Sequence, residues 1–152
     1  MVAAALERFW RIDAVVANAG FGAARGFTSE TPEHWRDMIL TNVLGVGLTI
    51  RASIDAIRES KGHFVLSGSL AGHQALPGSV YSATKWALSS LAEGRRQKLN
   101  GTGARTTLIS PGAVDTPFFD NPPSTETLQP QDVARAVMYA LSQPEPSTRT
   151  RS

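Results

Sequence analysis

Residues 12–20, Ile-Asp-Ala-Val-Val-Ala-Asn-Ala-Gly, decide the fold class of this 152-residue chain. The apolar, β-branched run predicts a buried strand over 12–17, and Asn-Ala-Gly closes it with a turn. Two similar runs, 63–66 and 105–109, also end in turn residues. Helix-length segments separate the three runs, so we predict parallel strands joined by crossover helices.

Four helices are expected around these strands. Thr31 followed by Pro32 is typical of a helix start, with the threonine as N-cap. Ser79 is a second N-cap candidate, and the polar residues from 143 to 152 predict a disordered tail. The expected helices cover residues 2–9, 32–59 with a kink near 42–47, 80–99 and 130–141. Together the elements predict an α/β fold with a doubly wound parallel sheet, in one domain over residues 1–142.

Composition excludes several classes of function. The net charge is only +2, which is too small for a nucleic-acid-binding surface. There is no Cys and the three His are far apart, so neither a disulfide framework nor a metal site is predicted. The longest apolar run, 43–50, is too short to span a bilayer, and we expect a cytoplasmic protein with no membrane partner. We expect Arg95, Arg96 and Lys98 to be solvated.

Tyr81 and Lys85 form the first candidate for chemistry. They are four residues apart in the predicted helix 80–99 and therefore share a face. A phenol is a weak acid at neutral pH, and a nearby ammonium lowers its pKa, so such a pair can exchange a proton with a substrate oxygen. Alone, the spacing is a weak indication, because many such pairs are only a ring and a charge on a helix surface.

Ser69 is the second candidate. It follows the strand 63–66, at the carboxyl edge of the predicted sheet, where α/β proteins bind ligands. Its hydroxyl could hold a carbonyl oxygen beside Tyr81. A hydrolase elbow is excluded, because it would require Gly at positions 67 and 71, which are Ser and Ala.

Three further motifs follow or interrupt the predicted elements. They are Ala17–Gly20 (ANAG), Thr41–Gly45 (TNVLG) and Ser110–Thr116 (SPGAVDT). The asparagine at 42 lies inside an apolar helix and needs hydrogen-bond partners. For each motif alone, a turn or a satisfied core polar group is the simpler interpretation.

The five motifs in this order, ANAG, TNVLG, SGSLAG, YSATK and SPGAVDT, resemble the short-chain dehydrogenase/reductase family over roughly residues 3–142. The resemblance implies a Rossmann-like fold, an NAD or NADP cofactor, and interconversion of an alcohol and a carbonyl compound by hydride transfer. It also implies a small-molecule substrate and a homo-oligomer formed through helices 32–59 and 80–99.

The resemblance also implies a role for each motif residue. Tyr81 would be the acid/base, and Lys85 would lower the pKa of Tyr81 and bind the nicotinamide ribose. Ser69 would polarise the substrate carbonyl. Asn42 would hold a water in a proton relay. The implied cofactor-binding residues are Asn18, Ala19, Gly20, Tyr81, Lys85, Pro111, Gly112, Val114 and Thr116. Phe118, Phe119 and the Pro-rich stretch would form a substrate lid, and His73, Gln74 and Leu76 would line the pocket. Gly68 stands where many relatives have a second Ser.

Part of the family pattern is absent from this sequence. No Gly-rich turn of the form G-x-x-x-G-x-G or G-x-G-x-x-G occurs, so we expect the first βαβαβ half and the final strand to be missing, with the first gap on the order of 60 residues. Such a turn grips the pyrophosphate through hydrogen bonds of about 1.5–3 kcal/mol each. We therefore expect weak cofactor binding by this chain alone. The alternatives are an inactive fragment that acts as an interaction module, and a non-functional truncation product.

Overall fold

The computed structural model describes residues 1–118 and 126–144 as three parallel strands and their helices. In chain order the elements are α1 (Val2–Phe9), β1 (Ala14–Ala17), α2 (Pro32–Ile39), the π-helix η1 (Leu40–Gly45), α3 (Val46–Ser60), β2 (His63–Ser67), the 3-10 turn η2 (Leu70–Gly72), α4 (Val80–Lys98), β3 (Arg105–Ile109) and α5 (Pro130–Ser142). The predicted α/β class and crossover connections are confirmed. Of the predicted tail, only residues 143 and 144 lie within the described residues.

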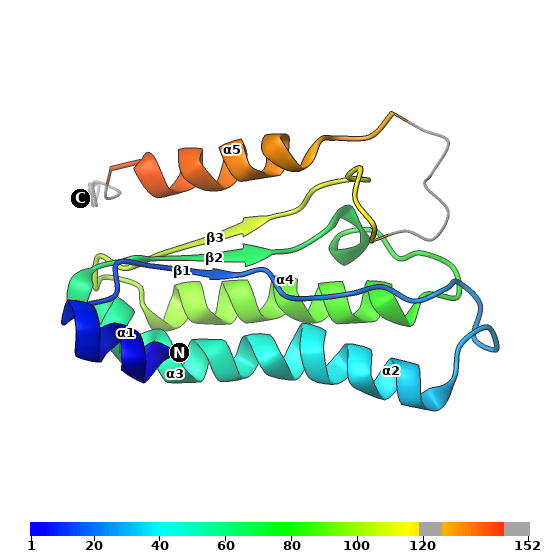
Figure 1. Cartoon of the computed structure of the whole chain (residues 1–152), viewed down its shortest axis with the longest axis horizontal. Helices are drawn as coiled ribbons and strands as arrows, with labels where there is room; N and C mark the ends of the chain where they lie inside the picture. The colour runs from blue at the N-terminus through cyan, green and yellow to red at the C-terminus, as the bar shows by residue number, and fades with distance from the viewer. Residues whose placement is uncertain (119–125, 145–152) are drawn as a thin grey trace, which may run out of the picture.

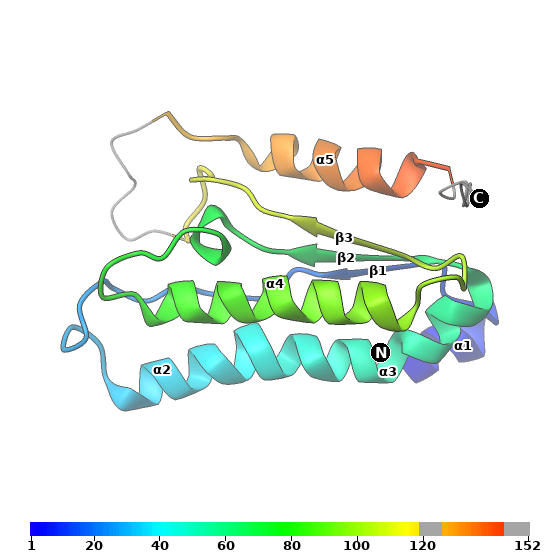
Figure 2. The same cartoon turned by 180° about the vertical axis from the view of Figure 1, so that it is seen from behind.

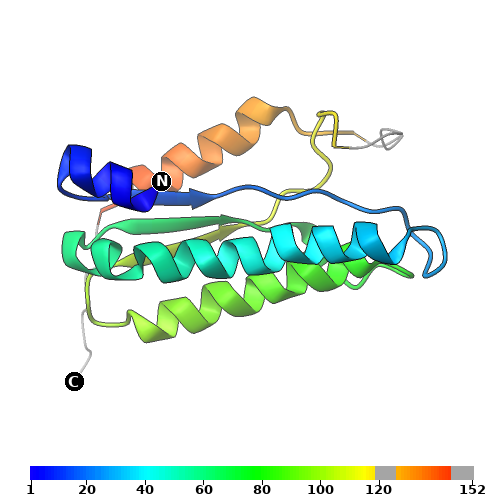
Figure 3. The same cartoon turned by 60° about the horizontal axis from the view of Figure 1, so that its bottom comes forward.

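The sheet has the order β1-β2-β3, and its register aligns the strand ends. Ala14 pairs with His63 and His63 pairs with Arg105, so all three strands begin at the same end of the sheet and finish at the opposite end. We call the end where the strands begin the amino edge, and the end where they finish the carboxyl edge. The continuous helix α2–η1–α3 and helix α4 cover one face, while α5 covers the other (Figures 1 and 2). Figure 3 shows α1 beside β1, near the end of α3. The carboxyl ends of the strands therefore meet at one place, which the long loops surround.

The core lies between the sheet and the layer of α3 and α4. Phe64 and Leu66 of β2 are completely buried, and Val46 and Leu88 pack against them from the two helices. Burial of such apolar side chains stabilises the fold by about 1.5–3 kcal/mol each. In contrast, α5 buries no residue completely, and Arg105 holds it by donating to the carbonyl oxygens of its last turn.

Local differences from the predicted elements have physical causes. Strand β1 begins at residue 14 instead of 12, because the Ile12 carbonyl accepts from the Ser60 hydroxyl at 2.6 Å and so lies outside the ladder. The predicted kink near 42–47 is the π-helix η1. Thr31 and Ser79 cap their helices as predicted, accepting from the backbone N–H of His34 and Ser82.

The prediction that Arg95 is solvated is wrong. Its side chain is 4% exposed and its guanidinium lies 4.5 Å from the centroid of the Phe64 ring. The position faces the sheet because it continues the buried stripe of α4. Arg96 and Lys98, by contrast, are exposed as predicted, and Arg96 pairs with Glu93.

Candidate active site

Ser67 and Ser69 stand at the carboxyl end of β2, as the strand–loop pattern predicted. The Ser69 hydroxyl oxygen caps the short turn η2 by accepting from the Ala71 N–H at 3.1 Å. This bond fixes the oxygen and leaves the O–H proton free to point elsewhere. Ser69 is also within hydrogen-bonding reach of Tyr81, since a bond between their side chains contributes to the pKa of the phenol.

Tyr81 and Lys85 share the face of α4 that turns toward this edge. The Lys85 Nζ lies 5.6 Å from the centroid of the Tyr81 ring and donates to the Ser67 carbonyl oxygen at 2.9 Å. Lys85 is 6% exposed, so its ammonium group is held beneath the surface rather than extended into water. The predicted pair is therefore formed, and the end of β2 anchors it.

Burial controls the acidity of both groups. Burial raises the pKa of Tyr81, and the hydrogen bond with Ser69 lowers it by less. Burial also lowers the pKa of Lys85 to about 8. The expected lowering of the Tyr81 pKa is therefore wrong for this chain alone, because burial disfavours the phenolate by more than the Ser69 hydrogen bond favours it.

Asn42 is completely buried and joins three elements. Its amide Nδ2 donates to the Phe21 carbonyl oxygen at 2.9 Å and to the Thr84 hydroxyl at 3.1 Å, while its Oδ1 accepts from the Phe21 N–H at 3.0 Å. The π-helix η1 gives the asparagine this position, because the wider turn displaces it from the regular helix surface. Both amide donors are used, which leaves acceptor capacity on Oδ1 alone.

The turn Asn18–Gly20 lies against the same cluster. The Ser67 hydroxyl donates to the Asn18 Oδ1 at 2.7 Å. A Cβ on Gly20 would lie 3.0 Å from the Asn42 Oδ1 and 3.8 Å from the Lys85 Nζ, so glycine permits this close approach. Ala19 is exposed beside them. Four of the predicted motifs thus converge on one edge.

The segment after β3 completes the site from the other side. The Pro111 carbonyl oxygen accepts from the Leu70 N–H at 3.0 Å, and Gly112 lies beside Leu70. Val114 forms an isolated bridge with Leu128, and the Thr116 hydroxyl accepts from the Phe118 N–H at 3.4 Å. Phe118 packs edge-on against Tyr81, with their ring centroids 5.6 Å apart. Phe119 and residues 120–125 of the predicted lid lie outside the described residues.

Some residues of this edge were not predicted from the sequence. Thr84 is buried and supports Asn42, and the buried Ser82 donates to the Ala71 carbonyl oxygen at 2.7 Å. Hydroxyl residues at 82 and 84, in the first turns of a helix that follows a Gly-rich loop, were the available signal. Of the predicted pocket wall, His73 reaches away from this cluster and bonds Ser110. Among the described residues, no group of three or more His, Asp or Glu could hold a metal ion.

Comparison with known proteins agrees with this arrangement. A family model described as short chain dehydrogenase matches residues 1–127. An uncharacterized oxidoreductase of Staphylococcus aureus (strain MRSA252) is 36% identical over 149 residues, which cover 95% of this chain and 64% of the relative. A counterpart in Staphylococcus saprophyticus is 34% identical and is covered to 66%. The chain thus spans about 64–66% of these relatives' length.

Solved structures show the same likeness. An alcohol dehydrogenase from the archaeon Thermococcus sibiricus, complexed with 5-hydroxy-NADP, superposes with a TM-score of 0.85 at 31% identity, covering 95% of this chain and 63% of that one. A serine dehydrogenase from Escherichia coli gives 0.83 at 32% identity, covering 95% and 64%. A 3-ketoacyl-(acyl-carrier-protein) reductase from Brucella melitensis, complexed with NADH, gives 0.84 at 26% identity, covering 93% and 64%.

Proposed function

This chain belongs to the short chain dehydrogenase family of oxidoreductases, and from that membership we propose that it interconverts an alcohol and an aldehyde or ketone with a nicotinamide cofactor. The convergence of Ser69, Tyr81 and Lys85 at the carboxyl edge of the sheet carries the proposal. The site combines a hydroxyl that can hold a carbonyl oxygen, a phenol that can give it a proton, and a buried ammonium group beside the phenol ring.

Tyr81 acts as the acid in the reducing direction. Because burial raises its pKa, the phenol keeps its proton at neutral pH and can donate it to the substrate oxygen. Ser69 orients that oxygen by donating its O–H. In the oxidising direction Tyr81 must first lose its proton, so we expect alcohol oxidation to be favoured at alkaline pH.

Lys85 links the phenol to the rest of the proton path. With a pKa near 8, its ammonium group exchanges protons readily around neutral pH. Asn42 supports a water that continues this path, and since both of its amide donors are used, that water donates to Oδ1. Thr84 holds Asn42 in this orientation.

The residues of this edge fit the nicotinamide end of NAD or NADP. The cradle around Gly20, which a Cβ would crowd, allows close approach, and Lys85 can donate to ribose hydroxyls. Asn18, Ala19, Pro111, Gly112, Val114 and Thr116 would line the same crevice. When bound, the nicotinamide supplies or accepts the hydride. The chain contains no Gly-rich phosphate turn, so we propose weak cofactor binding by this chain alone.

We also propose that the chain forms a homo-oligomer through α2–α3 and α4. Leu40, Leu44 and Leu48, four residues apart, are each about half exposed, and Trp86 of α4 is 48% exposed. Helix 32–60 is also long and apolar enough to cross a membrane, by length and composition alone. A subunit contact explains its exposed leucines while its opposite face packs on the sheet. Analytical ultracentrifugation showing only monomer, or only large aggregates, would contradict this contact.

The test of the proposed reaction uses the two tyrosines of the chain as a matched pair. NADH and NADPH are titrated by fluorescence, and turnover is measured on a panel of aldehydes and ketones. We expect Tyr81→Phe to reduce kcat at least about 100-fold without changing cofactor affinity, and Tyr139→Phe, on the exposed surface of α5, to change neither. Equal turnover of both variants would refute the role of Tyr81. Absence of binding by a folded, monodisperse chain would refute activity of the chain alone.

A further inference from the structure

Three hydrogen bonds join the loop that carries Ser69 to the last residue of β3 and to the segment that follows it. Two are made by the backbone: the Gly68 N–H donates to the Ile109 carbonyl oxygen at 2.7 Å, and the Leu70 N–H donates to the Pro111 carbonyl oxygen at 3.0 Å. The third is a side-chain bond between the His73 Nε2 and the Ser110 hydroxyl at 2.9 Å. Only this third bond depends on which side chains the sequence supplies.

Gly68 and Ser110 share one small volume. A Cβ at position 68 would lie 2.9 Å from the Ser110 Oγ and 2.9 Å from a methyl group of Leu108. The Ser110 hydroxyl thus shares, with the Leu108 methyl group and the Ile109 carbonyl oxygen at 3.1 Å, the space that a side chain at position 68 would need. Because His73 bonds this hydroxyl, it holds Ser110 against Gly68, directly before Ser69.

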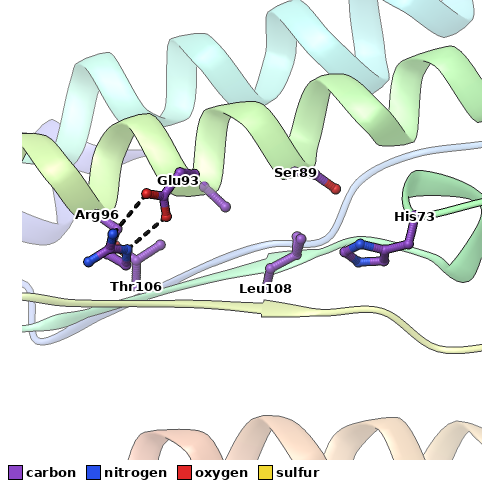
Figure 4. Close-up of a pocket in the computed structure, with 7 residues that line it drawn as sticks. His73, Ser89, Glu93, Arg96, Thr106 and Leu108 are labelled. Atoms are coloured by element: carbon purple, nitrogen blue, oxygen red, sulfur yellow. Dashed lines mark hydrogen bonds and ion pairs between the residues drawn. The ribbon is translucent and has the colours of Figure 1, made fainter.

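His73 itself does not touch the proposed reacting groups. It lies at one end of a groove of about 220 Å³ between α4 and β3, whose other end contains the Glu93–Arg96 ion pair. Figure 4 shows its ring beside Leu108, with Ser89 on the facing helix. Ser69, Tyr81 and Lys85 are not among the residues that line this groove.

We propose that His73 is a positioning residue that clamps Ser110 over Gly68 and thereby fixes the Ser69 hydroxyl and the Pro111–Gly112 segment relative to each other. The proposal rests on the proposed function, since it assigns to the clamp the placement of the group that orients the substrate oxygen. Gly68, His73 and Ser110 therefore depend on one another. Glycine suits position 68 because Ser110, together with Leu108 and the Ile109 carbonyl oxygen, leaves no room for a side chain, and His73 keeps that serine in place.

The first experiment measures position and needs no turnover. Backbone amide NMR shifts of the full chain are compared between His73→Leu, which removes the bond, and His73→Gln, which can retain it. We expect His73→Leu to shift the amides of Ser69, Leu70 and Gly112, and His73→Gln to restore most of the original shifts. Ser110→Ala should reproduce the leucine variant, and Ser110→Thr should not. Unmoved Ser69 and Leu70 amides in His73→Leu would overturn the clamp.

A second pair of variants tests the shared volume. Gly68→Ser should lower Tm by about 5 °C, because a core position without space is overfilled. Adding Ser110→Ala should recover about half of that loss, the remainder arising from Leu108. No recovery in the double variant would overturn the dependence of these residues on one another.

The kinetic arm separates this proposal from the proposed function. On a carbonyl substrate, His73→Leu should reduce kcat about tenfold with cofactor Kd unchanged, and His73→Gln should recover it. If the wild-type chain turns over and His73→Leu keeps its full kcat, the positioning role fails while the proposed function stands. If the wild-type chain binds no cofactor and turns nothing over, the proposed function fails, and the NMR and thermal results alone decide whether the clamp exists.

Discussion

The two edges of the sheet differ in how completely their buried polar groups are hydrogen-bonded. At the carboxyl edge, three side chains from different elements are hydrogen-bonded: Asn42 donates to Phe21 and Thr84, Ser67 to Asn18, and Lys85 to the Ser67 carbonyl oxygen. At the amino edge, His63, Arg95 and Arg105 are brought together and each makes at least one hydrogen bond, but the Arg95 Nε and Nη2 and the Arg105 Nε have no hydrogen-bond partner. Buried groups with partners hold a site together, whereas buried groups without them lower stability.

The amino edge nevertheless has a structural role. Arg105 donates to the carbonyl oxygens of Ala140, Leu141 and Gln143, which close the last turn of α5. A cation at the C-terminus of a helix is favourable, because these carbonyl groups otherwise lack partners. Arg95 in turn lies over Phe64 and donates to the Arg105 carbonyl oxygen at 3.0 Å. The amino edge thus anchors the end of α5, while the carboxyl edge brings the candidate active-site residues together.

Replacing Asn42 should have the largest effect on stability. Asn42→Leu removes three hydrogen bonds and leaves Phe21 and Thr84 without their partners, so we expect the free energy of unfolding to fall by about 3–4 kcal/mol. Urea denaturation measures this change. Asn42→Asp keeps the acceptor for the Phe21 N–H but loses the amide donors. Its free energy of unfolding should therefore lie between those of the wild type and Asn42→Leu. A loss below about 1 kcal/mol for the leucine variant would mean that the carboxyl edge does not depend on this network.

The amino edge should instead lower the stability of the chain as pH falls. Burial, with the nearby charges of Arg105 and Arg95, lowers the pKa of His63 to about 4. The unfolded chain then takes up a proton near pH 6.5 and the folded chain only near pH 4, so stability is lost between these values. The loss reaches about 3 kcal/mol, and it is complete below pH 4.

His63→Gln provides the comparison for this titration, because glutamine does not titrate and the carboxylates common to both chains cancel. The difference in unfolding free energy between wild type and variant should change between pH 6.5 and 4 and stay constant above pH 7. A difference in unfolding free energy that is independent of pH would show that His63 has the same pKa in the folded and the unfolded chain.

The sequence predicted one edge better than the other for a physical reason. Turn residues at strand ends, together with the Tyr81–Lys85 spacing, identify groups that converge, because parallel strands bring their carboxyl ends to one place. Whether Arg95 is buried depends on the angle at which α4 crosses the sheet, which local pattern does not determine. The same holds for Thr84 and for the His73–Ser110 bond, which join segments far apart in the chain.

Even the carboxyl edge contains one group that lowers stability. Burial lowers the pKa of Lys85 to about 8, so below pH 8 the folded chain holds a charge that water would stabilise better. We expect Lys85→Met to raise the free energy of unfolding by about 2 kcal/mol at pH 7, after allowing for its lost bond to Ser67. The gain should shrink as pH rises from 8 to 10.5, where the wild-type lysine becomes neutral first in the folded state. Denaturation experiments across this pH range test the prediction. A lower free energy of unfolding for Lys85→Met at pH 7 would show that Lys85 does not lower the stability of the chain.

The smallest effect is expected next to the amino edge, at Trp10. This residue ends α1 with φ at 65°, a left-handed conformation that is unfavourable for a bulky side chain, and its side chain is 89% exposed. Trp10→Gly should therefore stabilise the chain by about 1 kcal/mol, because glycine adopts this conformation without strain and little packing is lost. Trp10→Ala is the matched control: it removes the ring but keeps the Cβ, so it should bring no gain in thermal denaturation. Equal gains from both variants would assign the effect to the exposed ring, and the backbone strain at the end of α1 would then be negligible.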